Sequence, residues 1–443
     1  MLSLPLLDSA QGERPLLWSQ GQAVTVAEFL DSVAGLAERL PTHRYSLNLC
    51  EQRQDFLIAF CAALLRGQAN LLPPSRAPAV VEEMLATHAD AYICDDARVA
   101  QPDANPVATA VGDPRLPADQ VAVVAFTSGS TGAPQRHIKR WSSFAGSNAC
   151  NVARIRACLA PQYAGARPWI VATVPPQHMY GIETSVLLPL LGDMAVHGAR
   201  PLFPADIAAA LAEVPPPRIL VTTPVHLRAL SDGAQRMPGL ALVVSATAPL
   251  DQELARTIEQ KWSTRLLEMF GSTETCVIAT RETARENTWH LYPQIQLEPL
   301  EDGTTVSAPW FERSVTLQDM IELLPERRFS VRGRHADMVE VAGKRASLAD
   351  LTRRLQSLPG VSDAVVFQPD PPGARAVRRV AALAVAPGLD AATLCAQLAR
   401  SIDAAFIPRP LRLVQALPRN ELGKLPREQL LAALRAAAPA SRK

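Results

Sequence analysis

Residues 126–139 read FTSGSTGAPQRHIK, and they follow directly on the apolar run VAVVA at residues 121–125. A buried strand is therefore expected to open into a turn of small residues, namely Thr127, Ser128, Gly129, Ser130, Thr131 and Gly132. Glycine permits positive φ and close backbone approach, so the N–H groups and hydroxyls of such a turn can surround a phosphate. The alternative is a Ser/Gly-rich linker. The GxxxxGK(S/T) phosphate loop is excluded, because no Gly-Lys-Ser/Thr follows.

The composition is that of a globular enzyme with more than one domain. The chain has 443 residues, more than a single core usually supports. Its net charge of +1 gives no electrostatic basis for binding nucleic acid or an anionic membrane. We expect no transmembrane segment and no secretory signal, because no apolar run approaches ~20 residues and the N-terminus turns polar early. Seven dispersed cysteines without CxxC pairs indicate reduced thiols in the cytoplasm rather than a zinc site or disulfides.

Helical patterns alternate with short apolar runs over the first half of the chain. VAEFLDSVAGLAERL and QDFLIAFCAALLRG predict helices, whereas YSLNLC, AYIC, WIVATV and RILVTT predict strands. This alternation favours an α/β architecture with a mostly parallel sheet. The sequence becomes charged and hairpin-like over residues 311–345, and a compact α+β segment follows. We therefore predict a large N-terminal domain of layered α/β subdomains (1–333) and a small mobile α+β domain (334–443).

A second segment suited to phosphate chemistry is LLEMFGSTETCVIATR at residues 266–281. Glu274 follows the hydroxyl residue Thr273, and a single carboxylate near a phosphate suits Mg²⁺, which also takes phosphate oxygens. Phe270 could stack on a purine. The alternative is an ordinary strand and turn with a solvated glutamate. The run LVVSATAPL (242–250) is another strand that leads into a turn of small residues.

Two further features lie in the C-terminal third. Asp319 and Arg334 stand on either side of an apparent hairpin, where a carboxylate and a guanidinium could hold a ribose; a surface ion pair is the alternative. Lys424 follows Gly423 in LPRNELGKLPREQL. Its ammonium could neutralise charge that develops at a reacting carboxylate or phosphate, or it could simply be solvated.

In this order, the segments resemble the motifs of the adenylate-forming superfamily, which includes acyl- and aryl-CoA synthetases, peptide adenylation domains and luciferases. The resemblance implies that the loop of residues 127–134 binds the β- and γ-phosphates of ATP. Glu274 would bind Mg²⁺, Thr273 would lie near the α-phosphate, and Lys424 would drive adenylation. The ribose would be held by Asp319 and Arg334. The adenine would be flanked by Ala246, Thr247, Phe270 and Gly271, and the acyl pocket would include His178, Tyr180, Gly181 and Cys276.

The sequence departs from the superfamily pattern at two places. The phosphate loop usually continues Pro-Lys-Gly, but here Gln135 and Arg136 follow Pro134, so Arg136 or Lys139 would have to supply the missing charge. The hinge usually reads Gly-Arg-x-Asp, and Ala336 stands where the aspartate is expected. The short N-terminal region and the Gln-bearing loop most resemble the AMP ligases of aryl polyene and xanthomonadin-type pigment pathways.

The resemblance implies ATP-dependent activation of a small carboxylic acid as acyl-AMP, with release of pyrophosphate. In the pigment-pathway ligases the acid is a hydroxybenzoate or hydroxycinnamate, and the acceptor is the phosphopantetheine thiol of an acyl carrier protein. Two alternatives stay open. One is an acyl- or aryl-CoA ligase that uses free CoA, and the other is a non-catalytic nucleotide-binding module.

Overall fold

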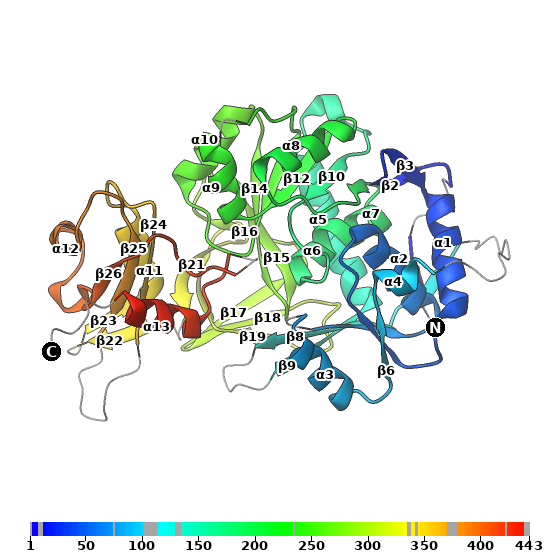
Figure 1. Ribbon diagram of the computed structural model, residues 1–443, viewed down its shortest axis with the longest axis horizontal. Helices are drawn as coiled ribbons and strands as arrows, with labels where there is room; N and C mark the ends of the chain where they lie inside the picture. Colours follow the sequence, from blue (N-terminus) through cyan, green and yellow to red (C-terminus); the bar gives the residue numbers. More distant parts are fainter. Residues whose placement is uncertain are drawn as a thin grey trace. The chain divides into compact units, whose positions relative to one another are not determined.

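The computed structural model describes residues 2–7, 12–73, 76–101, 113–128, 134–233, 235–334, 338–341, 344–369, 379–420 and 423–437. The chain divides into two compact units (Figure 1). The first contains Met1–Ile295 and Ala308–Arg313, and the second contains Gln296–Ser307 and Ser314–Lys443. The predicted mixed α/β fold, with a large N-terminal part and a smaller C-terminal part, is confirmed. The predicted boundary at residues 333 and 334 stays a prediction, and the hinge residues 335–337 lie outside the described residues.

The first unit contains a five-stranded sheet built from crossover connections, in the order β6-β4-β5-β8-β9. The strands are β4 (Tyr45–Asn48), β5 (Ala69–Leu72), β6 (Ala91–Cys94), β8 (Val121–Ser128) and β9 (Pro134–Arg140). Pairing is parallel except between β8 and β9. Parallel strands need crossovers: α2 (Arg53–Leu65) connects β4 with β5, and α3 (Pro78–Thr87) connects β5 with β6, whereas α1 (Val26–Arg39) precedes β4. A capping box between Thr25 and Glu28 starts α1 where the sequence predicts it.

A second sheet of the first unit runs in the order β16-β15-β14-β13-β12-β10-β11-β2-β3. Its central strands are parallel: β2 (Pro15–Ser19), β10 (Trp169–Ala172), β11 (Ala195–His197), β12 (Arg218–Thr222), β13 (Leu242–Ser245) and β14 (Leu266–Ser272). Antiparallel strands follow at both ends: β3 (Gln22–Thr25), β15 (Cys276–Arg281) and β16 (Trp289–Leu291).

Helices cover both faces of this second sheet, which explains why its strands are continuous apolar runs. One face packs against α8 (Pro204–Glu213), α9 (Pro224–Asp232) and α10 (Gln252–Trp262), which lie together in Figure 1. The alternate residues Ile170, Ile219 and Val244 are also fully buried. Elements that contact β10 or β15 include α5 (Trp141–Cys158), α6 (Met179–Ile182) and the π-helical turn η2 (Glu183–Leu187), which continues into α7 (Leu188–Leu191).

The second unit is α+β, as the sequence predicts for the C-terminal segment. Its hairpins and small sheets are formed by β17 (Gln296–Leu300), β18 (Gly303–Ser307), β19 (Val315–Leu317), β20 (Asp319–Leu324), β21 (Arg328–Arg334), β22 (Met338–Val341), β23 (Lys344–Ser347), β24 (Asp363–Phe367), β25 (Ala381–Val385) and β26 (Leu411–Leu413). Its helices include α11 (Leu348–Gln356), α12 (Ala391–Leu398) and α13 (Arg427–Ala436). Apolar residues of α11, α12 and β24–β26 form one core.

Two expectations from composition concern membranes and thiols. Within the described ranges, the chain contains no helix with the length and apolar character needed to span a bilayer. All seven cysteines are described, and each is a free thiol.

Candidate active site

The predicted phosphate loop connects two antiparallel strands at the edge of the five-stranded sheet. Strand β8 ends at Ser128, which pairs with Pro134 at the start of β9, and Thr127 pairs with Gln135. The loop residues Gly129, Ser130, Thr131 and Gly132 lie outside the described residues. The strand expected before the loop is therefore confirmed as β8, and the binding of phosphate by the loop stays a proposal.

The strand that leaves this loop presents two polar side chains on one face. Successive side chains of a strand alternate between faces, so His137 and Lys139 share a face, whereas Arg136 and Ile138 are exposed. Lys139 is only 4% exposed, and its Nζ donates a hydrogen bond to the backbone carbonyl oxygen of Glu274. Nε2 of His137 lies 3.4 Å from Oε1 of Glu274. Strand β9 thus reaches the second predicted phosphate motif.

That second motif is the turn between β14 and β15. The pairing shifts between Phe270 and Gly271, and a Cβ at Gly271 would lie 2.1 Å from the carbonyl oxygen of Cys276. Ser272 and Thr275 close the turn: the N–H of Ser272 donates to Oγ1 of Thr275 (3.2 Å), and the N–H of Thr275 donates to Oγ of Ser272 (3.3 Å). Thr273 and Glu274 therefore stand at its tip.

The Glu274 carboxylate is suited to a cation. Burial alone would raise its pKa, but hydrogen bonds from the Ser272 hydroxyl and its own backbone N–H, together with the charges of His137 and Lys139, outweigh burial and lower the pKa. The group is therefore ionised at neutral pH. Magnesium takes oxygen ligands and is commonly held by one or two carboxylates together with phosphate oxygens. Glu274, with the adjacent Thr273 hydroxyl, fits that preference.

A buried carboxylate that the sequence analysis missed lies behind this turn. Glu183 of η2 is 1% exposed. Its Oε1 accepts hydrogen bonds from Oγ of Ser147 (2.5 Å) and Nδ2 of Asn151 (3.2 Å), and its Oε2 accepts from the N–H of Val277 (3.0 Å). Burial raises the pKa of Glu183 despite these bonds. The available signal was a glutamate inside the largely apolar helical run GIETSVLLPLL.

The residues expected at the acyl pocket gather around α6. Sγ of Cys276 lies 3.9 Å from Sδ of Met179, so β15 and α6 meet there. Tyr180 is buried, and its hydroxyl donates to the carbonyl oxygens of Thr222 (3.2 Å) and Val244 (3.1 Å). A Cβ at Gly181 would lie 1.9 Å from the carbonyl oxygen of Pro175. Tyr180 and Gly181 therefore contribute to the packing of α6 against its neighbours. His178 directly precedes α6 and is half-buried.

The residues expected to flank adenine follow the ends of neighbouring strands. Parallel β13 and β14 are in register at Ser245 and Glu268, so the residues after Ser245 and those near Phe270 lie at the carboxyl edge of the sheet. They are Ala246, Thr247 with φ of 82°, Phe270 and Gly271. Ligands of α/β sheets bind at this edge. The Phe270 ring already contacts Trp289, at 5.1 Å between centroids.

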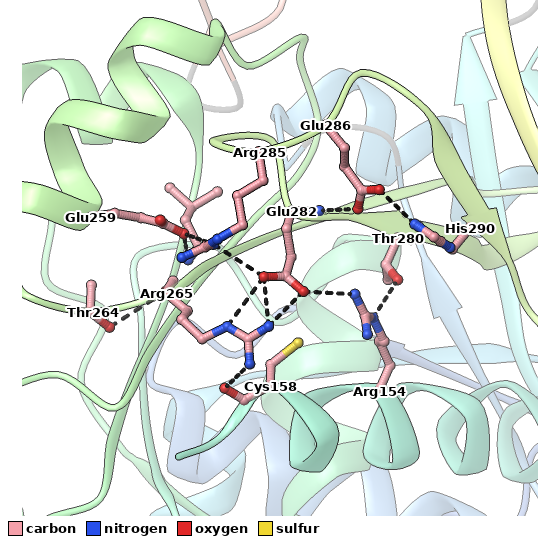
Figure 2. Close-up of polar contacts among 11 residues, drawn as sticks. Arg154, Cys158, Glu259, Thr264, Arg265, Thr280, Glu282, Arg285, Glu286 and His290 are labelled. Carbon is pink, nitrogen blue, oxygen red and sulfur yellow. Dashed lines mark hydrogen bonds and ion pairs between the residues drawn. The ribbon is translucent and has the colours of Figure 1, made fainter.

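A charged cluster holds the base of the β14–β15 hairpin (Figure 2). The Glu282 carboxylate accepts three hydrogen bonds from the Arg265 guanidinium, the shortest being 2.6 Å. It also contacts Arg154 of α5 (3.3 Å) and Arg285 (3.1 Å). Burial by itself would raise the pKa of Glu282, but the hydrogen bonds and charge of Arg265 outweigh it and lower the pKa. The cluster fastens the hairpin to α5.

The remaining candidate residues belong to the second unit. Asp319 and Arg334 are register partners in the β20–β21 hairpin, so the predicted hairpin is confirmed. The backbone carbonyl of Asp319 accepts a hydrogen bond from Oγ1 of Thr304 (2.7 Å), and the side chain of Arg334 lies outside the description. Lys424 is exposed, and its N–H donates to Oδ1 of Asn420 (2.9 Å) in a turn where Gly423 has φ of 76°.

Comparisons with known proteins agree with this arrangement. Residues 36–298 match the family described as AMP-binding enzyme. The 4-coumarate–CoA ligase of Halorhodospira halophila is 29% identical over 306 residues, 68% of this chain and 73% of the relative. The same enzyme of Rhodobacter capsulatus is 30% identical over 298 residues, 67% of this chain and 73% of the relative.

Solved structures show the same fold at low sequence identity. O-succinylbenzoate Coenzyme A synthetase (MenE) of Bacillus subtilis, in complex with ATP and magnesium, superposes with a TM-score of 0.81 at 17% identity, covering 97% of this chain and all of that one. ATP-bound MatB of Rhodopseudomonas palustris superposes with a TM-score of 0.78 at 17% identity, covering 96% of each chain. The chain therefore belongs to the AMP-binding enzyme family and is an adenylate-forming acid–thiol ligase.

Proposed function

We propose that this enzyme activates a small aromatic carboxylic acid, such as a hydroxycinnamate or hydroxybenzoate, and transfers it to a phosphopantetheine thiol. The observation that carries the proposal is the meeting of two motifs at Glu274. His137 and Lys139, on the strand that leaves the predicted phosphate loop, both contact this residue. A phosphate chain and a cation could therefore share one site.

The chemistry consists of two displacements. A carboxylate oxygen of the acid attacks the α-phosphorus of ATP, and the bond to the β-phosphate oxygen breaks, which yields acyl-AMP and pyrophosphate. The thiol sulfur then attacks the acyl carbon; the acyl–oxygen bond breaks, AMP leaves, and the thiol proton passes to solvent.

The residues of this chain would act mainly by positioning and by electrostatics. Glu274 would hold the magnesium ion, which supplies positive charge to the phosphate oxygens when bound. Lys424, on the second unit, would stabilise the charge that develops during adenylation. Asp319 and Arg334 would hold the ribose. In this proposal, rotation of the small domain about residues 334–337 exchanges Lys424 for the incoming thiol.

Two observations favour different acceptor thiols for the acyl group. The Gln-bearing phosphate loop resembles ligases of aryl polyene and xanthomonadin-type pathways, which use an acyl carrier protein. The relatives from Halorhodospira halophila and Rhodobacter capsulatus bear the name 4-coumarate–CoA ligase, which favours free CoA and also supports an aromatic acid. The absence of a lysine at Gln135 favours a third candidate, a nucleotide-binding module without catalysis.

Pyrophosphate release with Mg·ATP tests the proposal across benzoates, cinnamates and straight-chain fatty acids. We expect release with a hydroxycinnamate or hydroxybenzoate, and the labelled acyl group identifies the acceptor when CoA and a holo carrier protein are offered separately. Release with fatty acids alone would contradict the aromatic substrate. Binding of ATP without release on any acid would support the non-catalytic module.

A further inference from the structure

We propose that Lys139 and Glu183 are positioning residues that hold the turn carrying Glu274, Lys139 at the tip of the turn and Glu183 at the start of the strand that follows it. They would thereby set the Glu274 carboxylate in place for magnesium. The inference rests on the proposed function, because it takes Glu274 as the residue that holds the ion.

Lys139 holds the turn from the side of the phosphate loop. Its side chain is buried, and Nζ donates to the carbonyl oxygen of Glu274 itself, so the bond acts on the backbone from which the carboxylate projects. Hydrogen bonds with an ionised donor are about twice as strong as neutral ones. The ammonium also lies 6.0 Å from the centroid of the Phe311 ring, which packs beside it. Lys139 therefore binds this turn, so of the two candidates for the missing positive charge at the phosphate loop the exposed Arg136 is the one available to contact the phosphates.

Glu183 holds the start of β15, the strand that leaves the turn. The β14–β15 ladder is irregular there, because the register shifts at Gly271 and Cys276 has φ of 62°. The N–H of Val277, directly after this distortion, donates to both carboxylate oxygens of Glu183, at 3.1 and 3.0 Å. Ser147 and Asn151 of α5 donate to the same carboxylate and fix its orientation.

The hydrogen bonds around Glu183 extend to a further residue, Tyr292. The hydroxyl of Tyr292 donates to Oδ1 of Asn151 at 2.7 Å, which fixes the amide that contacts Glu183. The turn is therefore held by Lys139 at Glu274, by Glu183 at Val277 and by its own Ser272–Thr275 bonds.

A contribution to stability alone does not explain why Lys139 and Glu183, two residues with ionisable side chains, are buried here. Buried ionic groups are costly to desolvate, and apolar residues of similar volume are often as stabilising or more so. Both residues instead contact the backbone of the same short segment, Lys139 at Glu274 itself and Glu183 three residues later at Val277. Residues that orient a metal ligand typically change metal affinity by about 10–100-fold when they are replaced.

The test measures how much magnesium strengthens ATP binding, by calorimetric titration of ATP with magnesium and with EDTA. The quantity compared is the ratio of the ATP dissociation constant in EDTA to that in magnesium. This ratio does not require turnover, and general damage to the fold would weaken ATP binding in both conditions alike. Lys139→Met is expected to lower this ratio by about tenfold, with partial recovery in Lys139→Arg, which keeps a donor. Lys261→Met is the matched control, because Nζ of Lys261 also donates to backbone carbonyls, those of Ser231 and Gly233. It should change the ratio by less than about twofold.

Glu183 gives an independent arm. Glu183→Leu removes the acceptor of the Val277 N–H and should lower the ratio as Lys139→Met does, whereas Glu183→Gln keeps an acceptor and should lose less. If Glu183→Leu does not fold, the magnesium ratios of the Lys139 variants test the positioning role by themselves. A normal ratio in folded Lys139→Met, with a reduced ratio in Glu274→Gln, would overturn the positioning role alone. A normal ratio in Glu274→Gln would overturn the metal-binding role of Glu274 and with it this inference.

Discussion

Nε2 of His137 lies 3.4 Å from a carboxylate oxygen of Glu274, although His137 lies in one sheet of the first unit and Glu274 lies on a turn between two strands of the other. His137 follows the predicted phosphate loop on β9, and Glu274 stands on the β14–β15 turn. The contact brings two motifs together that are individually ambiguous in the sequence. It supplies the geometric basis for treating them as one site.

Replacing Glu274 with Gln should abolish the magnesium requirement together with most of the activity. The amide keeps the size of the side chain but lacks the charge that an oxygen-preferring cation needs. We expect pyrophosphate release to fall by about a hundredfold or more at saturating ATP, with little response to added magnesium. Glu253→Gln, an exposed glutamate of α10, is the control. Wild-type magnesium dependence in Glu274→Gln would assign the ion to other ligands.

Lys424→Ala should separate the two half-reactions. If Lys424 stabilises charge only during adenylation, acid-dependent pyrophosphate release should fall by about a hundredfold or more. Thioester formation from supplied acyl-AMP should continue at close to the wild-type rate. Arg427→Ala, which removes an exposed positive charge nearby, should leave both steps intact. Equal loss of both half-reactions in folded Lys424→Ala would argue against this division of labour.

Gly181→Ala should destabilise the protein strongly. The added Cβ would lie 1.9 Å from the backbone carbonyl oxygen of Pro175, which cannot move as a flexible side chain could. Overpacking of this kind typically costs about 1–3 kcal/mol, and thermal unfolding measures it. Gly239→Ala is the matched control, since nothing lies within 4 Å of its added Cβ. Equal melting temperatures for the two variants would show that α6 can shift away from Pro175.

Glu282→Gln should weaken the attachment of the β14–β15 hairpin to α5. The amide loses the charge that pairs with Arg265, Arg154 and Arg285 and can no longer accept on both atoms. We expect the free energy of unfolding to fall by about 1–3 kcal/mol at pH 7, again with Glu253→Gln as the control.

The pH dependence of that difference has a defined sign. The pKa of Glu282 is lowered from 4.5 in the folded protein, so its stabilising contribution is complete above the unfolded pKa. The contribution is lost as the pH falls through the lower folded pKa. The gap in melting temperature between wild type and Glu282→Gln should therefore be full at pH 7 and close below pH 4.5. A gap that is constant down to acid pH would mean that the charge of Glu282 contributes nothing.

Local patterns in the sequence were sufficient for several of the elements. The apolar run at residues 121–125 lies within β8, the predicted helix from Val26 is α1, and Asp319 and Arg334 pair across a hairpin. These features depend on side-chain periodicity and turn chemistry, which act over a few neighbouring residues. The superfamily resemblance was readable for the same reason, because each of its motifs is a short local segment.

Only the folded chain shows which buried groups share hydrogen bonds. Glu183 is one glutamate in an apolar run until α5 brings Ser147 and Asn151 to it and β15 brings Val277. Lys139, likewise, has no visible partner until the two sheets place Glu274 beside it. A buried polar group must find its partners across the chain, since water is excluded. The packing of distant elements supplies those partners, and local sequence carries no record of that choice.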